Sequence, residues 1–98
     1  KIVKNYIKKC YKKIVLKCHP DKNKLLKDNK LFVLVQNYYD NELLIGILYI
    51  YYIANINPPE PLNNVDPNNI NTLQEIIIEH IFKEIYIVQK KIETIKRN

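Results

Sequence analysis

His19, Pro20 and Asp21 are the residues of this sequence whose types and spacing could do chemistry. An imidazole and a carboxylate this close together could in principle serve as a general acid–base pair. No nucleophile or second carboxylate is recognisably placed with them, and Pro20 turns their side chains apart. We therefore expect no catalytic residue in this chain and no enzymatic activity.

Metal binding is the second chemistry to weigh, because Cys18 precedes His19 directly. A site made of Cys18, His19 and Asp21 would lack a fourth ligand at a recognised spacing, and His80 is more typical of a packed or half-exposed histidine than of a ligand.

Cys10 and Cys18 would lie roughly 12 Å apart along one helix, too far for a disulfide. We expect no metal, no cofactor and, with reduced thiols and no signal peptide, a cytoplasmic location.

The same motif fits docking on another protein better than it fits catalysis. Proline fixes its backbone φ at about −65°, so His19 and Asp21 would lose little conformational entropy on binding. The carboxylate of Asp21 could accept two parallel hydrogen bonds from one arginine.

Positive charge is confined to the first third of the chain, although the net charge is +6 overall. Residues 1–30 hold eleven lysines against two aspartates, whereas residues 31–98 hold five basic and eight acidic side chains. Such a cationic segment would be steered towards an acidic surface, and the association should weaken with salt. The lysines that we expect to bind a partner are Lys8, Lys9, Lys12, Lys13, Lys17 and Lys22.

Helices are the elements expected to position these groups. A chain of 98 residues with 47% apolar residues, one glycine and five prolines favours one all-α unit over a turn-rich β fold. A helix over residues 1–17 would leave Leu16 exposed among the lysines and end before Pro20, followed by a polar loop over residues 18–28. Its buried stripe is expected to be Val3, Ile7, Cys10, Tyr11, Ile14 and Cys18.

A second, extended helix is predicted over residues 29–56, capped by Asp28 or Asn29 and antiparallel to the first. Residues 43–56 carry no charge, but this run is shorter than the roughly 20 residues of a membrane span. We expect a buried core helix there, in preference to an interfacial or membrane segment or a pair of strands. Gly46, the only glycine, marks either a close contact with a neighbouring helix or a break in this one.

Proline and asparagine dominate residues 57–71, which predict a linker between a helical hairpin of residues 1–56 and a C-terminal helix of residues 72–98. Thr72 and Glu75 have the spacing of a capping box. The helix carries a coiled-coil-like seam that needs a partner, either the second helix or a second copy of the chain in a homodimer. The seam residues are Ile78, Ile81, Ile85, Val88, Ile92 and Ile95.

The stretch IKKCYKKIVLKCHPDKN, residues 7–23, resembles helix II and the following loop of the J domain, the DnaJ-type co-chaperone module. Phe32, Val35 and Tyr39 follow at the offsets of the apolar residues that face helix II from that family's helix III. The resemblance covers about residues 2–43, less than half of the chain. The family's first helix is missing from this chain or lies upstream of it.

This resemblance implies a hairpin of J-domain type that docks on the ATPase domain of a DnaK-type chaperone. The lysine face would meet the chaperone, Asp21 would engage an arginine there, and ATP hydrolysis would be stimulated in the partner. The residues implied in binding are His19, Pro20, Asp21 and Lys22 together with the lysines of the first helix.

Two other functions stay open from the sequence. The chain could be a degenerate J-like assembly module that associates through the seam, or the basic helix could bind nucleic acid along its phosphates. Against nucleic acid, the helix has no arginine for guanine edges, and Tyr11 falls in the buried stripe. We expect no membrane partner for this segment.

Overall fold

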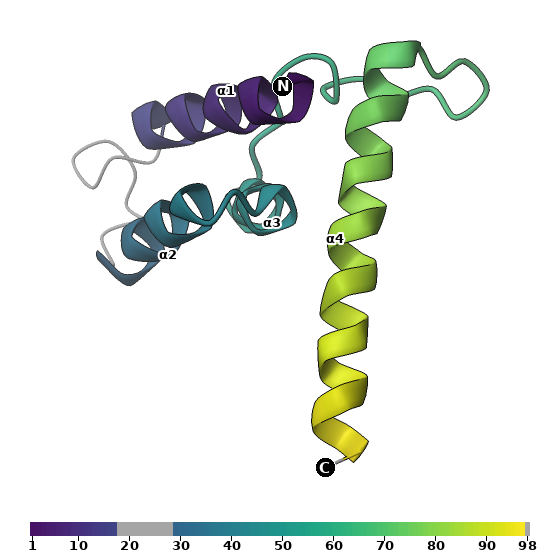
Figure 1. Ribbon diagram of the computed structural model, residues 1–98. Coiled ribbons are helices and arrows are strands. Elements are labelled where there is room, and N and C mark those ends of the chain that lie inside the picture. The colour runs from purple at the N-terminus through teal and green to yellow at the C-terminus, as the bar shows by residue number, and fades with distance from the viewer. Residues whose placement is uncertain (18–28, 98) are drawn as a thin grey trace.

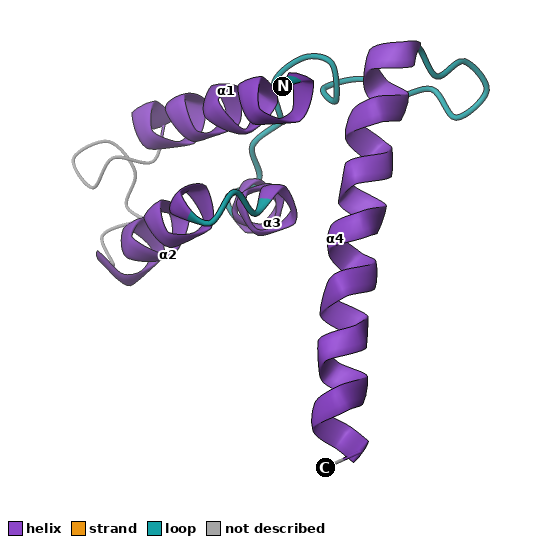
Figure 2. Cartoon of the chain, viewed as in Figure 1, coloured by secondary structure: helices purple, strands orange, loops and turns teal. Residues whose placement is uncertain are grey.

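The structure is a computed structural model, and it describes residues 1–17 and 29–97 of the chain (Figure 1). Its elements are α1 (Ile2–Lys17), α2 (Asn29–Asp40), α3 (Leu44–Ile53) and α4 (Thr72–Arg97). No strand occurs among these residues, which confirms the expected all-α class (Figure 2). Asp28, proposed as a cap, lies outside the described residues.

The first three helices form a small cluster with α4 along one side of it (Figure 1). α1 and α2 run antiparallel, α3 is seen end-on beside them, and the N-terminal half of α4 packs against α1 and α3. The C-terminal half of α4 extends away from the cluster. The radius of gyration, 14.7 Å, therefore exceeds the roughly 13 Å of a compact chain of this length.

Four residues of α1 supply one side of the core. Of the predicted stripe, Ile7, Cys10 and Ile14 are buried, and Tyr6 is buried beside them. Val3 and Tyr11 are only half-buried, and Cys18 lies outside the described residues. Leu16 is 69% exposed, as expected. Burial of each large aliphatic side chain contributes about 1.5–3 kcal/mol relative to an exposed one. The buried apolar residues are Tyr6, Ile7, Cys10, Ile14, Val35, Leu44, Ile47, Ile50, Tyr51 and Ile77.

The extended second helix predicted from the sequence is wrong, because the chain breaks at residues 41–43 into α2 and α3. Glu42 adopts a left-handed backbone with φ 54°. Its N–H donates to the carbonyl of Tyr39 (3.0 Å), and the N–H of Leu43 donates to that of Tyr38 (2.8 Å). These two bonds are the Schellman arrangement that ends a helix, usually with glycine in the left-handed position.

Gly46 is a point of close contact and not the break, which settles the alternative that the sequence left open. A Cβ at Gly46 would lie 2.5 Å from Cγ of Tyr38, closer than two carbons can approach, so glycine lets α2 and α3 meet here. α3 buries Leu44 and Ile47 in the core, so the core-helix prediction is confirmed. Among residues 1–17 and 29–97, no helix combines the length and apolar character needed to cross a bilayer.

α4 begins with a capping box that lies one residue before the predicted pair of Thr72 and Glu75. The N–H of Gln74 donates to Oδ1 of Asn71 (2.8 Å), and the N–H of Asn71 donates to Oε1 of Gln74 (3.2 Å). Asparagine is as good an N-cap as threonine. The sequence therefore predicted the type of cap correctly and placed it one residue too late.

The predicted seam of α4 is covered only in part. Ile77, outside the predicted seam, is buried, and Ile81 packs against the core beside it. Val88 and Ile92 are each 47% exposed, and Ile95 is 74% exposed. The difference arises because α4 packs against the corner between α1 and α3, and not along one partner helix.

Candidate partner-docking face

The outward face of α1 carries an unoccupied pair of lysines. Lys8 and Lys12 are one turn apart on the side opposite the buried stripe, and both are exposed. Neither makes a hydrogen bond or an ion pair with the residues that the structure describes. Leu16 continues the same line one turn later. We call Lys8, Lys12 and Leu16 the outer edge of α1.

A second pair of lysines faces the proline-rich linker. Nζ of Lys9 donates to the carbonyl of Glu60 (3.2 Å), and Nζ of Lys13 donates to that of Asn57 (2.9 Å). Proline has no amide hydrogen, so this segment has more carbonyl acceptors than donors, and lysine supplies the missing donors. Lys9 and Lys13 therefore hold the linker against α1, which the sequence alone did not indicate.

The remaining predicted binding residues are divided between the end of α1 and the loop that follows. Lys17 is exposed at the last position of α1. Lys22 and the motif of residues 19–21 lie outside the described residues. Lys4, at the other end of α1, forms an ion pair of 3.4 Å with Glu42. Both partners are largely exposed, so this pair contributes at most about 1 kcal/mol.

An aromatic contact holds α1 against α2. The rings of Tyr11 and Tyr39 stack with centroids 4.0 Å apart and an interplanar angle of 11°. Oη of Tyr11 donates to Oε1 of Gln36, and Nε2 of Gln36 donates to Oδ1 of Asp40 (3.1 Å). These contacts fix the two helices whose ends flank residues 18–28. They also occupy the ring of Tyr11, which is half-buried.

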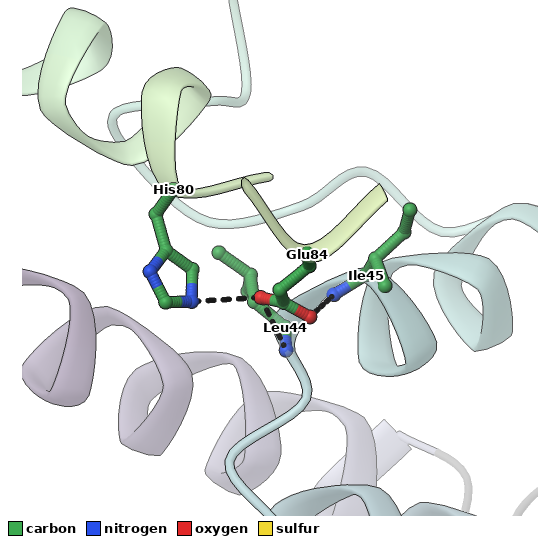
Figure 3. Close-up of polar contacts among 4 residues, drawn as sticks. All are labelled: Leu44, Ile45, His80 and Glu84. Carbon is green, nitrogen blue, oxygen red and sulfur yellow. Dashed lines mark hydrogen bonds and ion pairs between the residues drawn. The ribbon is translucent and has the colours of Figure 1, made fainter. Parts of the chain in front are cut away.

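Glu84 is the main buried charge of the described residues, and it lies where α4 crosses the start of α3 (Figure 3). Its two carboxylate oxygens accept hydrogen bonds from the N–H groups of Leu44 and Ile45, each 3.1 Å long. Nε2 of His80 lies 2.8 Å from Oε2, which makes an ion pair when the imidazole is protonated. Leu43, the N-cap residue of α3, has no side-chain cap, so Glu84 caps this helix from forty residues away.

Glu84 and its neighbours position α3 and leave no free carboxylate oxygen for a substrate. His80 is half-exposed, in agreement with the sequence-based interpretation. Among residues 1–17 and 29–97, no three potential ligands gather as a metal site would require. The signal for Glu84 in the sequence is a charge four residues after His80, on the face that Ile77 and Ile81 bury.

Buried hydroxyl groups join α1 to the rest of the core. Oη of Tyr6 donates to the carbonyl of Pro59 (2.8 Å), and Oη of Tyr51 donates to that of Cys10 (2.6 Å). Burial raises the pKa of the Cys10 thiol to about 11 and raises the pKa of Tyr6 as well. Because the thiolate is the reactive form, Cys10 is a structural residue and not a nucleophile.

Comparison with models of protein families, with curated proteins and with solved structures finds no match to this chain. The candidate face therefore depends on the residues and contacts described above. Its distinguishing feature is that Lys8 and Lys12 are directed outward, whereas Lys9 and Lys13 are held by the linker.

Proposed function

We propose that this chain is a J-domain-like co-chaperone or adaptor that docks on a DnaK-type chaperone and stimulates its ATPase. The observation that carries the proposal is the outer edge of α1, with Lys8 and Lys12 unoccupied, on the helix that leads into His19, Pro20 and Asp21. The likeness of residues 7–23 to the J domain joins these features into one face.

The outer edge would supply the electrostatic part of docking. Lys8 and Lys12 each present an ammonium group one turn apart, and Leu16 adds an apolar contact next to them. Exposed charges of this kind raise the association rate with an acidic surface more than they raise the final affinity. Because the Debye length is about 8 Å at physiological ionic strength, docking should weaken clearly with added salt.

The motif after α1 would supply specificity. Pro20 restricts the backbone between His19 and Asp21, and a carboxylate held in this way can receive an arginine of the chaperone in a bidentate pair. The stacked Tyr11 and Tyr39 support this role, because they fix the helices on both sides of the motif. The chain would then change the conformation of its partner, and hydrolysis would take place there.

The test is the single-turnover ATPase of a DnaK-type chaperone, measured against increasing concentrations of the 98-residue chain. Wild type should stimulate, and His19→Gln should abolish stimulation without loss of helicity. Lys8→Glu with Lys12→Glu should raise the half-maximal concentration about tenfold, since two lost charge contacts cost about 1.4 kcal/mol together.

A matched control removes the same charge elsewhere. Lys83→Glu with Asn63→Asp and Asn69→Asp, all at exposed positions outside α1, changes the net charge equally, so its half-maximal concentration should stay close to that of wild type. Equal stimulation by wild type and His19→Gln, or none by either, would refute the co-chaperone proposal.

Nucleic-acid binding is the competing use of the same lysines, and the experiment separates the two. It predicts that random duplex DNA is bound with a steep salt dependence and without any effect of His19→Gln. The stacking of Tyr11 on Tyr39 argues against it, because this ring is not free to stack on a base.

A further inference from the structure

The C-terminal half of α4 extends beyond the other helices (Figure 1). Its sequence continues the apolar face that the first half of α4 packs against the core. Within the cluster this face buries Ile77 and packs Ile81 against the core. Past Glu84 it continues at helical spacing with Val88, Ile92 and Ile95, which are 47%, 47% and 74% exposed. We call residues 85–97 the tail.

The tail has little tertiary support for its helical structure. Residues 85–97 span about 20 Å at about 1.5 Å per residue, and helices in proteins gain most of their stability from packing of an apolar face. Its apolar residues recur at spacings of three and four, the pattern with which one helix packs on another. A second apolar helix along the tail would therefore both bury this face and stabilise the helix.

An apolar groove of about 400 Å³ begins where the tail leaves the cluster. Val88 belongs both to this groove and to the exposed face of the tail, so the two surfaces are continuous. Gly46 lies in the lining and adds no side chain to it. The groove is lined by Tyr38, Leu43, Ile45, Gly46, Tyr49, Glu84, Ile87, Val88 and Lys91.

We propose that a second copy of this chain covers these surfaces, with the two tails antiparallel and the end of each tail at the groove of the other copy. A register that sets Val88 against Ile92 also sets Ile85 against Ile95, so each apolar layer is filled from both copies. The same register brings Ile95 of the second copy alongside residue 85, next to the groove. The contact is reciprocal, as a two-fold dimer requires.

The charges of the tail favour the antiparallel arrangement. Residues 90–97 contain four basic residues and one acidic residue. A parallel pair would align these two segments and place like charges together, at a cost in stability. The antiparallel pair instead lays each segment along residues 83–90 of the other copy, which hold fewer positive charges.

The groove supplies area that the tails lack. A few aliphatic layers form too short a coiled coil for a stable dimer, since specific interfaces bury about 1,200–2,000 Å² in total. Contact with the aromatic wall formed by Tyr38 and Tyr49 adds to the interface in both copies. With this added area, the short exposed face of the tail is sufficient to bind a second copy.

Sedimentation equilibrium of the 98-residue chain tests the proposal, with a mass twice 11.7 kDa expected at tens of micromolar. Ile92→Asp with Ile95→Asp should raise the dissociation constant at least 100-fold, and the fold should persist because neither residue belongs to the core. Phe82→Ser is the matched control, because it removes a 65% exposed apolar side chain from a different face of α4.

Separate variants test the contact with the groove and the antiparallel orientation of the two tails. Tyr49→Glu, which leaves α4 unchanged, should raise the dissociation constant about tenfold. In a Cys18→Ser background, a chain with Val88→Cys should form disulfides with a chain carrying Ile92→Cys faster than either chain forms them with itself. A monomeric wild type, an unchanged Tyr49→Glu variant, faster self-crosslinking or dissociation of the Phe82→Ser control would overturn the proposal.

Discussion

Replacement of Glu84 should destabilise this protein more than any other exchange of a charged residue among those described. Glu84 is only 7% exposed, and its carboxylate accepts hydrogen bonds from both N–H groups at the start of α3. Glu84→Ala leaves these amides without a partner, because Leu43 offers no side-chain cap. The amide of Leu44 is buried and that of Ile45 is partly buried, so neither can be fully repaired by water.

The magnitude follows from these contacts. An unsatisfied buried amide costs about 1–3 kcal/mol, and loss of a negative charge at a helix N-terminus costs about 0.3–1 kcal/mol more. We therefore expect Glu84→Ala to lower the free energy of unfolding by about 3–4 kcal/mol, a large part of the 5–15 kcal/mol typical of a domain. Glu84→Gln keeps one acceptor oxygen, so its cost should be about half as large.

The assay is urea denaturation followed by circular dichroism, together with hydrogen exchange at the amides of Leu44 and Ile45. Glu79→Ala is the control, because Glu79 is an exposed glutamate of the same helix and its loss should change stability by less than about 0.5 kcal/mol. The competing effect is the cost of burying a carboxylate. If that cost were larger than the value of the two bonds, Glu84→Leu would be as stable as wild type or more stable, and our reasoning would be refuted.

Two further predictions concern the turn after α2 and the buried thiol. Glu42→Gly should stabilise the fold by about 0.5–1 kcal/mol in urea denaturation, because relief of the left-handed backbone outweighs the exposed ion pair with Lys4, whereas Glu42→Ala should give no gain. Burial raises the pKa of Cys10 from its ordinary value of 9.0 to about 11, so the unfolded chain loses this proton first as the pH rises. Its contribution to stability is complete below pH 9.0 and is lost by about pH 11, a fall of roughly 3 kcal/mol. Denaturation at about pH 8 and pH 10.5 should show a smaller alkaline loss in Cys10→Ala, and an equal loss in both proteins would contradict the assignment.

Local patterns in the sequence predicted α1 well. Ile7, Cys10 and Ile14 recur at helical spacing, and lysines fill the rest of the helix, so the buried side could be read directly. Tyr6 was missed because its burial goes with a distant contact, the hydrogen bond that its hydroxyl donates to the carbonyl of Pro59. A contact between residues so far apart in the chain leaves no periodic signal.

The break between α2 and α3 could not be predicted for a related reason. Helix ends are usually recognised by glycine in the left-handed position, and here that position is occupied by Glu42. The single glycine, Gly46, lies three residues past the break and serves the contact with Tyr38. An uninterrupted apolar run therefore concealed two helices.

The sequence predicted which lysines belong to the candidate face, but not which of them the linker holds. The sequence identifies the lysines of α1, yet nothing in it indicates that the carbonyls of Asn57 and Glu60 hold Lys13 and Lys9. Likewise, the seam of α4 predicts a helix that packs, but the choice of Ile77 over Ile78 depends on the corner that α1 and α3 form. Tertiary packing decides such features.

Only the first part of the long linker is attached to the helices, and this determines where its length can vary. Nε2 of Gln74 donates to the carbonyls of Pro61 and Asn64, and Tyr6 holds Pro59, so the first part of the segment is fastened to helices on both sides. Residues 65–70, which follow this attachment, are exposed throughout. Since Glu84 sets where α4 meets α3, insertions or deletions in these exposed residues would change the outline of the loop and leave the register of α4 in place.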